Sequence, residues 1–386
     1  MNAKRTNMCS FELFDYQKED LDRLCDDYNE TVENDQYQRA LVSIPMGGGK
    51  TNLAFSYIQK LEEAGNKSFI VVCPTLKILI QTCERFDEYD IDQVFHFAIF
   101  ASQGKNGLFH STKQVIQEWF KNHPLSIIFT TYLSFPKLMK FIKPDVVVLD
   151  EVHRMKRWGL LENDVHYVGM SATPVGCPFR KVVHRSLGWG IDAGALCDYQ
   201  IEFLMVDSYH PVSIIDWIIE EGLSKKILVV SRYQADAIHI AKGLEGAGIA
   251  AESVIGDDSQ SQRAKSEKRF RKEKVAVLST VNIYREGSDI QEIDSVFYHH
   301  KVKSKTAWFQ IFGRALRKFP GKTKSRIYIP FIYNQVEKMF PYFTMVLTLL
   351  KTEEDGRSPP YRVRYMEKEL RSVAKQLEHD LDTIFR

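Results

Sequence analysis

Nine short runs of β-branched and other apolar residues alternate along this chain with segments of helical periodicity. Each run is five or six residues long and mainly apolar, which is typical of strands buried on both faces. Strands that alternate with helices favour parallel sheets built from β-α-β units. The pattern therefore predicts an α/β protein with two lobes, each containing a parallel sheet. The runs are residues 40–44, 68–73, 126–130, 146–150, 166–170, 227–231, 275–279, 295–299 and 325–330.

The boundary between the lobes is expected between Thr173 and Lys225, where glycine and proline residues interrupt the pattern. We place the first lobe in residues 1–190 and the second in residues 200–333. A chain of 386 residues is long enough for this division, since a domain usually takes about 100–200 residues. The remaining residues, 334–386, are expected to form a helical tail.

Two helices are predicted in this tail, over residues 336–350 and 367–385. The second has an apolar stripe at helical spacing. We expect this stripe to pack on the second lobe, and binding of a partner protein is the alternative. The stripe is Leu370, Val373, Leu377, Leu381 and Ile384.

Composition excludes several classes of protein. The six cysteines contain no C-x-x-C pair, so the sequence signals neither a zinc site nor a redox motif. No apolar run approaches the roughly 18 residues of a membrane helix, and the polar N-terminus leads into no signal-peptide core. We expect an intracellular protein without a membrane partner, acting as a monomer or as a subunit of a complex.

A glycine-rich segment follows the first apolar run and reads Met46-Gly47-Gly48-Gly49-Lys50-Thr51. Between a strand and a helix, such a segment presents backbone N–H groups to anionic phosphates. Lys50 is expected to bind the β- and γ-phosphates, and Thr51 to hold Mg²⁺. The strict phosphate-loop pattern needs glycine at position 44, where this chain has Ile44.

Two carboxylates, Asp150 and Glu151, end the run 146–150. Residues at the carboxyl end of a parallel strand face the ligand crevice. Asp150 suits Mg²⁺, and Glu151 is then placed to deprotonate an attacking water. Together with Lys50, this pair predicts a nucleoside triphosphatase. His153 has no ligand partners at zinc spacing, so we expect a coupling or hydrogen-bonding role for it.

The order of these and later motifs resembles that of superfamily 2 helicase-type ATPases of the DExH class. Within that superfamily the chain most resembles the group of type III restriction-enzyme motor subunits and related DNA-repair and phage helicases. The resemblance covers residues 14–317. Phe14-Asp15-Tyr16-Gln17 resembles the motif whose glutamine reads adenine, and Ser171-Ala172-Thr173 resembles the motif that couples hydrolysis to movement.

Further motifs of the family lie in both lobes. In the family, motifs Ia and Ib contact the nucleic-acid backbone, and motifs IV and V follow in the second lobe. Motif VI, here residues 310–317, fits the pattern Q-x-x-G-R-x-x-R, and motif V is residues 286–290. Residues expected at the nucleic acid are Pro74, Thr75, Thr130, Thr131, Arg232 and Thr280.

This resemblance implies two tandem RecA-like lobes, with ATP and Mg²⁺ between them. Arg314 and Arg317 would come from the second lobe to stabilise charge on the γ-phosphate. Residues expected to carry the reaction are Lys50, Thr51, Asp150, Glu151, Gln310, Arg314 and Arg317. Residues expected to contact the nucleotide are Gln17, Met46, Gly47, Gly48, Gly49, Lys50, Thr51, Gly287 and Asp289.

The expected partner is a nucleic acid, with DNA favoured over RNA by analogy with the group. The expected activity is ATP-driven helicase or translocase movement. Two alternatives remain, a translocase that remodels protein–DNA complexes without separating strands and an ATP-gated clamp with slow turnover. Protein partners could dock through the C-terminal helices.

Two basic segments, residues 263–274 and 301–326, could contact phosphates. For the first segment, an ordinary solvated helix face is an equally good interpretation. Trp308 and Phe309 could stack on bases, although packing in the core is favoured.

Overall fold

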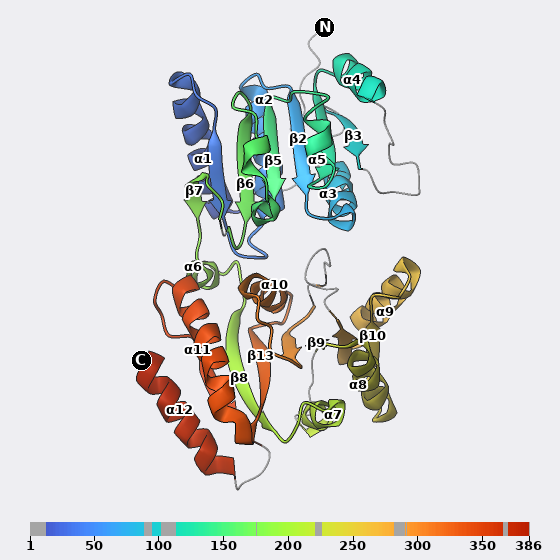
Figure 1. Ribbon diagram of the computed structural model, residues 1–386, viewed down its shortest axis with the longest axis vertical. Coiled ribbons are helices and arrows are strands. Elements are labelled where there is room, and N and C mark those ends of the chain that lie inside the picture. Colours follow the sequence, from blue (N-terminus) through green and yellow to red (C-terminus); the bar gives the residue numbers. More distant parts are fainter. Residues whose placement is uncertain are drawn as a thin grey trace. The chain divides into compact units, whose positions relative to one another are not determined.

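The computed structural model describes residues 13–88, 95–101, 113–174, 176–220, 226–281, 290, 292–365 and 370–385. The chain divides into two compact units, one made of residues 1–45 and 49–185 and the other of residues 46–48 and 186–386. The division between residues 185 and 186 falls inside the predicted boundary region. Each unit is a parallel sheet between two layers of helices (Figure 1). None of the helices in the described part of the chain combines the length and apolar content needed to cross a bilayer.

The first unit contains a seven-stranded sheet with the order β3-β4-β2-β5-β6-β1-β7, and all its pairings are parallel. Its strands are β1 (Arg39–Ser43), β2 (Ser68–Cys73), β3 (His96–Phe100), β4 (Ser126–Thr131), β5 (Val146–Asp150), β6 (His166–Ser171) and β7 (Arg180–His184). Its helices are α1 (Asp15–Glu33), α2 (Lys50–Glu63), α3 (Leu76–Glu88), α4 (Lys113–Asn122) and α5 (Phe135–Leu138), with short 3₁₀ turns η2 (Val152–Arg154) and η3 (Trp158–Leu160).

The second unit repeats this arrangement, with the order β10-β11-β9-β12-β13-β8-β14 and parallel pairings throughout. Its strands are β8 (Asp198–Val206), β9 (Lys226–Val230), β10 (Ala251–Val254), β11 (Ala276–Thr280), β12 (Ser295–Tyr298), β13 (Lys324–Ile332) and β14 (Tyr361–Arg364). Its helices are α6 (Leu187–Asp192), α7 (Pro211–Glu220), α8 (Gln234–Gly246), α9 (Gln260–Lys272), α10 (Lys305–Ala315), α11 (Val336–Glu353) and α12 (Arg371–Phe385), with the 3₁₀ turn η5 (Tyr333–Gln335).

The central strands are buried on both faces, which is why they read as continuous apolar runs. In β2, Phe69 and Val71 pack into the core beneath α1, α2 and α3, while Ile70 and Val72 pack into the core beneath α4 and α5. Since successive side chains of a strand point to opposite faces, residues on both faces of such a strand are mainly apolar. All nine predicted runs lie at strands of the two sheets.

Five strands, β3, β7, β8, β10 and β14, were not predicted. Most of these carry polar or charged residues on one face, so they lack a continuous apolar run. One of them, β14, lies within the tail that was expected to be helical. The two predicted tail helices are present as α11 and α12, and both pack into the main core of the second unit.

The apolar face of α12 is shifted from the predicted stripe. Leu377 and Leu381 are buried as expected, together with Ala374 and Phe385. Val373 and Ile384 were assigned to the stripe but are 36% and 50% exposed, respectively. The expected packing of this helix on the second unit is therefore confirmed, with a partly different set of buried residues.

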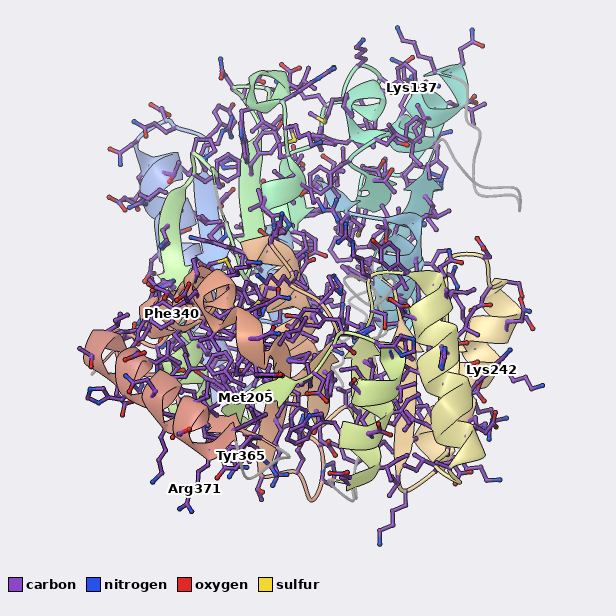
Figure 2. The ribbon with its side chains drawn as sticks, turned by 60° about the horizontal axis from the view of Figure 1, so that its bottom comes forward. Lys137, Met205, Lys242, Phe340, Tyr365 and Arg371 are labelled. Carbon is purple, nitrogen blue, oxygen red and sulfur yellow. The ribbon has the colours of Figure 1, made fainter. Side chains whose placement is uncertain are left out.

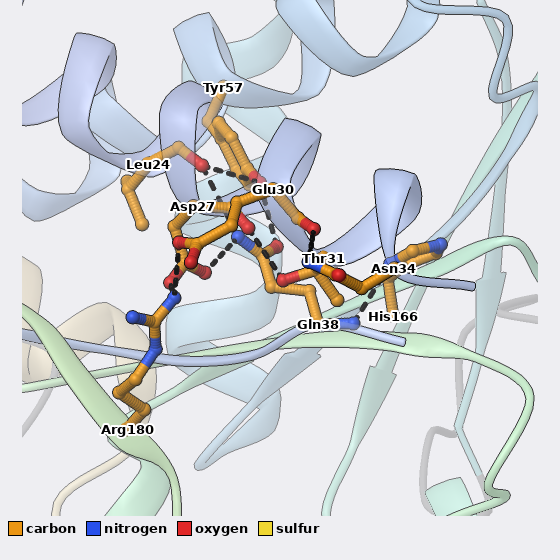
Figure 3. Close-up of polar contacts among 9 residues, drawn as sticks. All are labelled: Leu24, Asp27, Glu30, Thr31, Asn34, Gln38, Tyr57, His166 and Arg180. Carbon is orange, nitrogen blue, oxygen red and sulfur yellow. Dashed lines mark hydrogen bonds and ion pairs between the residues drawn. The ribbon is translucent and has the colours of Figure 1, made fainter. Parts of the chain in front are cut away.

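A buried polar network ties α1 to the sheet of the first unit (Figure 3). The Gln38 side chain donates to Asp27 Oδ2 over 2.7 Å, and Tyr57 donates to Gln38 Oε1 over 2.7 Å. Arg180 on β7 forms an ion pair with Asp27 from the other side. Asp27 is only 6% exposed, so its carboxylate depends on these donors.

Replacing Asp27 with alanine should lower the free energy of unfolding by about 1–3 kcal/mol, because the Gln38 amide loses its carboxylate acceptor. Urea denaturation measures this difference. Glu30→Ala is the matched control, since Glu30 lies on the same helix and faces the same Arg180 at 3.6 Å, but its side chain is 68% exposed. The control should change the free energy by less than about 1 kcal/mol. Equal effects of the two changes would contradict a structural role for the buried network.

Candidate nucleotide site

Three segments that follow parallel strands of the first sheet begin at the same edge of that sheet. Strand β6 lies between β1 and β5, with Ser43 opposite Ser171 and Asp150 opposite Met170. Because all three strands are parallel, their carboxyl ends lie on the same edge. The glycine-rich loop, the acidic pair and the Ser-Ala-Thr segment are the residues that follow these strands.

The glycine-rich loop has a backbone that glycine makes possible. Gly47 and Gly49 have φ angles of 85° and 76°, in the left-handed region, and α2 starts directly after them at Lys50. A Cβ atom at Gly49 would also clash with Gln17 Nε2, so another residue here would displace the Gln17 side chain. The loop thus joins strand and helix as expected for a phosphate-binding loop.

Lys50 folds back over the loop. Its ammonium group donates to the carbonyl oxygens of Ile44 and Pro45, at 3.1 and 3.3 Å. Thr51 is the next residue of α2 and is half-buried. A lysine ammonium can bind phosphates as a point charge, and the role expected for Lys50 at the β- and γ-phosphates stays a prediction.

Gln17 is held against the same loop. Its side chain is 1% exposed, donates to the carbonyl of Gly49 over 3.2 Å and accepts from the N–H of Phe14 over 3.0 Å. These two bonds fix both ends of the amide. The adenine-reading role expected for Gln17 stays a prediction, and the structure gives this residue a direct contact with the phosphate-loop backbone.

Asp150 is half-buried at the end of β5. Burial, and next the charge of Glu151, raise the pKa of Asp150 to about 7, while the charge of Lys50 lowers it. The carboxylate accepts the N–H of Glu151 over 3.0 Å, and the hydroxyl of Tyr132 donates to the Asp150 carbonyl over 2.8 Å. A bound divalent cation would favour the ionised carboxylate.

The oxygens of Asp150 and Thr51 are hard donors of the kind that Mg²⁺ prefers. Within the described residues, no group of three or more His, Cys, Asp or Glu side chains could by itself hold a metal ion. The expected role of Thr51 and Asp150 at Mg²⁺ stays a prediction.

Glu151 adopts a left-handed backbone conformation, with φ 50° and ψ 55°. Such a conformation is uncommon for a residue other than glycine and is often found at functional sites. It marks the point where the chain leaves β5 and enters η2.

The Ser171 hydroxyl connects the acidic pair to the Ser-Ala-Thr segment. It donates to Glu151 Oε2 over 3.2 Å and lies 2.9 Å from His153 Nδ1. The N–H of Thr173 donates to the same hydroxyl over 3.1 Å. His153 Nδ1 also lies 3.3 Å from the Glu151 carboxylate, and burial lowers the pKa of His153. The hydrogen-bonding role expected for His153 is thus present.

In the second unit, the motif VI residues lie on and just after α10. Gln310 and Arg314 are buried, and Arg317 follows the helix, half-buried, in a backbone bridge with Leu196. Lys322 donates to the carbonyls of Ala315 and Arg317 and so closes the end of this helix. The motif V residues Gly287 and Asp289 lie outside the described residues.

Trp308 belongs to the core of the second unit. It is fully buried, stacks on Tyr298 with ring centroids 5.6 Å apart, and stacks on Phe312 at 4.9 Å. The preferred interpretation of this residue as a core residue is confirmed.

The residues expected at the nucleic acid fall into two groups. Thr130 and Thr280 are buried, and their hydroxyls donate to the carbonyls of Phe100 and Val254, each on a neighbouring strand. These two side chains therefore contribute to the sheets, and the motif can contact a ligand only through nearby backbone or other residues. Side chains in the second group are at least partly exposed: Pro74, Thr75, Thr131 and Arg232.

In the basic segment 263–274, several side chains already have partners. Arg269 forms ion pairs with Glu245 and Glu252, at 2.9 and 2.6 Å. Arg263 donates to two backbone carbonyls of the preceding loop. These contacts favour a structural role for part of this segment.

Sequence reasoning did not find the contribution of Tyr132. Its hydroxyl, in the loop after β4, donates to the Asp150 carbonyl and so supports the backbone of the acidic pair. In the sequence, Tyr132 is marked only by its position next to Thr130 and Thr131. The sequence also did not indicate that Lys322 donates to the carbonyls of Ala315 and Arg317. Lys322 lies in the basic segment 301–326, which was expected to be available for phosphates.

Two family models match the chain. Residues 10–176 match the model "Type III restriction enzyme, res subunit", and residues 211–319 match "Helicase conserved C-terminal domain". Among curated proteins, the DEAD-box ATP-dependent RNA helicase RhpA of Helicobacter pylori is 22% identical over 316 residues, which are 76% of this chain and 62% of the relative. The ATP-dependent RNA helicase CshA of Listeria monocytogenes is 20% identical over 70% of this chain and 55% of its own. The chain thus spans less than two thirds of these relatives.

Solved structures share the fold of two tandem RecA-like lobes. The type ISP restriction-modification enzyme LlaBIII bound to DNA has a TM-score of 0.75 at 17% identity, over 97% of this chain and 33% of that enzyme. A putative HsdR subunit of a type I restriction enzyme from Vibrio vulnificus has a TM-score of 0.64 at 18% identity, over 91% of this chain and 68% of the subunit fragment. Mss116p bound to single-stranded RNA and AMP-PNP has a TM-score of 0.58 at 14% identity, over 88% of this chain and 73% of its own.

Proposed function

Because this chain belongs to the superfamily 2 helicase-type ATPases, we propose that it hydrolyses ATP in response to a bound nucleic acid and moves along the strand. The observation that carries the proposal is the convergence of Lys50, Asp150 and Glu151 at one sheet edge, with Ser171 bonded to Glu151. Phosphate binding, metal binding and proton acceptance are thereby available at a single site.

In the proposed reaction, Lys50 and the loop N–H groups hold the phosphates of ATP. Mg²⁺, held through Thr51 and Asp150, would neutralise charge on the β- and γ-phosphates. Glu151 orients a water and accepts its proton as the water oxygen bonds to the γ-phosphorus. The bond from that phosphorus to the β–γ bridging oxygen then breaks, and ADP and phosphate leave.

We propose that Ser171 couples ATP hydrolysis to conformational change in the rest of the protein. Its hydroxyl contacts both Glu151 and His153, so a change at the Glu151 carboxylate alters the hydrogen bonds of the Ser-Ala-Thr segment. Such a local change can bias a larger conformational equilibrium only if the two conformations bind ATP differently.

DNA is the proposed track. The solved relative with a TM-score of 0.75 is bound to DNA, whereas the curated relatives are RNA helicases. Steady-state ATPase rates with no nucleic acid, single-stranded DNA, duplex DNA and single-stranded RNA test the proposal. Stimulation to about 1–100 ATP per second by a DNA would support it. Greater stimulation by RNA would overturn the choice of track, and ATP-dependent binding with slow turnover would favour a clamp.

Arg317→Ala should lower kcat by about 10³-fold or more while leaving the Kd for nucleic acid nearly unchanged, because a guanidinium at the γ-phosphate acts mainly in the transition state. Steady-state kinetics and fluorescence anisotropy measure the two quantities. Lys318→Ala, which removes the charge of the adjacent exposed residue, is the control and should leave kcat intact. A weaker Kd with normal kcat would instead assign Arg317 to the nucleic acid.

A further inference from the structure

One end of the second sheet carries charged residues on a face that elsewhere packs against helices. In β8, Leu204 and Val206 point into the core beneath α7 and α8. Alternate residues share a face, so Gln200 and Glu202 lie on that same face, and neither belongs to the core. The apolar packing therefore stops at Leu204.

Three arginines lie beside these polar residues on the neighbouring strands. Arg326 of β13 is paired with Gln200, while Arg362 and Arg364 of β14 are paired with Glu202 and Leu204. Residues paired in a sheet point to the same face. The three guanidinium groups thus come from two strands that flank β8.

A buried carboxylate fixes Arg362. Its Nε lies 2.5 Å from Glu202 Oε2, and Glu202 is fully buried, whereas 48% of the Arg362 side chain is exposed. Burying a carboxylate is costly unless a charged partner compensates for it. The ion pair therefore holds Arg362 in place and leaves half of it accessible.

Arg364 and Arg326 are also held by buried aromatic residues. The guanidinium carbon of Arg364 lies 5.7 Å from the ring centroid of Trp217, which is 3% exposed. Arg326 shares a face of β13 with Tyr328, which is 1% exposed; Tyr328 raises the pKa of Arg326, and nearby Arg362 lowers it. Each arginine thus has its own support, and the charges of Arg326 and Arg362 repel each other.

The arginines line a cavity of about 650 Å³. Its lining residues are Arg326, Arg362, Val363, Arg364 and Tyr365. The cavity is open to solvent, so a phosphate group attached to a longer molecule could enter it. Three positive side chains face it, and Glu202 beneath them supplies one negative charge. An anion in the cavity would relieve the repulsion between the arginines.

We propose that this cavity is a second anion site, separate from the phosphate loop, which binds a phosphate group carried by a nucleic-acid strand or free in solution. Arginine suits this ligand because its planar fork donates two parallel hydrogen bonds to phosphate oxygens. Arginines that are already held in place lose little conformational freedom on binding. The site does not depend on ATP hydrolysis and goes beyond the proposed function.

The test uses the full chain with Lys50→Ala, so that the phosphate loop contributes little. Arg326→Gln/Arg364→Gln is compared with Lys242→Gln/Lys338→Gln, which removes two exposed charges elsewhere in the same unit. Figure 2 shows Lys242 on α8, away from Tyr365. The first probe is a fluorescein-labelled 12-nucleotide DNA without ATP, followed by anisotropy at several salt concentrations. The second probe is inorganic phosphate. Its binding is measured as the rise in the Tm of the protein relative to the Tm in sodium chloride at equal ionic strength.

If a strand is the ligand, the arginine variant should raise the Kd for DNA about tenfold or more and reduce the number of released counterions by about two. If free phosphate is the ligand, DNA binding stays unchanged and the rise in Tm is lost. The lysine control should preserve both signals. No difference between the variants with either probe would overturn the site.

Arg326→Lys/Arg364→Lys supplies the comparison if the glutamine variant does not fold, as judged by circular dichroism. It keeps the charge but loses the fork, so we expect a smaller loss of affinity. An oligoglutamate of equal charge is added as a competitor. If it matches the effect of DNA or phosphate, the assignment to phosphate is overturned, because the site would then respond only to negative charge.

Discussion

Replacing Lys50 with alanine is expected to lower kcat for ATP hydrolysis by about 10²–10³-fold or more, since a positive charge at the phosphates stabilises the transition state. In the structure, the Lys50 ammonium spans the carbonyls of Ile44 and Pro45 at the base of the loop. Its charge also lowers the pKa of Asp150. The substitution therefore removes a phosphate contact and raises the cost of keeping Asp150 ionised.

The matched control is Lys60→Ala on the same helix. Lys60 is half-exposed and pairs with Glu63 at 2.8 Å, so its loss should leave turnover within about twofold and stability nearly unchanged. Malachite-green phosphate release measures turnover in both variants at saturating nucleic acid. Normal turnover in Lys50→Ala, with a normal circular dichroism spectrum, would exclude the glycine-rich loop as the phosphate site.

Glu151→Gln is expected to preserve ATP binding and to lower turnover by about 10²–10⁴-fold, the usual contribution of a general base. Glutamine has the shape of glutamate and an oxygen that still accepts the Ser171 hydroxyl bond of 3.2 Å. The left-handed backbone at this position is equally available to both residues. What the variant lacks is the charge that accepts a proton from water.

Binding of a fluorescent ATP analogue and single-turnover hydrolysis separate these two effects. Glu63→Gln, the same change at an exposed residue of α2, controls for the loss of one negative charge. The assignment of Glu151 as the base fails if the variant hydrolyses ATP at the normal rate. It also fails if the variant is folded but no longer binds the analogue.

The sequence predicts those strands whose two faces both meet apolar helices. In β2 every residue is buried, and the strand has the same bounds as the predicted run. In contrast, β8 contains Gln200 and Glu202, and β14 alternates tyrosine, arginine and valine, because part of their shared face carries charges instead of a helix. A four-residue alternation is too short to distinguish a strand from a loop.

The sequence predicts those parts of the candidate site that follow from one rule, namely that the carboxyl ends of parallel strands lie at the same edge of a sheet. This rule alone places Lys50, Asp150 and Glu151 at one edge, because each of them follows a buried apolar run. It does not give the bond between Ser171 and Glu151, which depends on the position of β6 between its neighbours. It also does not show that Thr130 donates to a carbonyl inside the sheet.

The position of β8 has a consequence for synthesis on the ribosome. Its partners β13 and β14 are residues 324–332 and 361–364, so both edges of this strand stay unpaired until those residues have been made. A long apolar strand with open edges is prone to pair with other chains. Glu202 places one carboxylate in the middle of this strand, and a charge at that position opposes aggregation. We therefore expect the buried Glu202 to protect the nascent chain before Arg362 arrives to neutralise it.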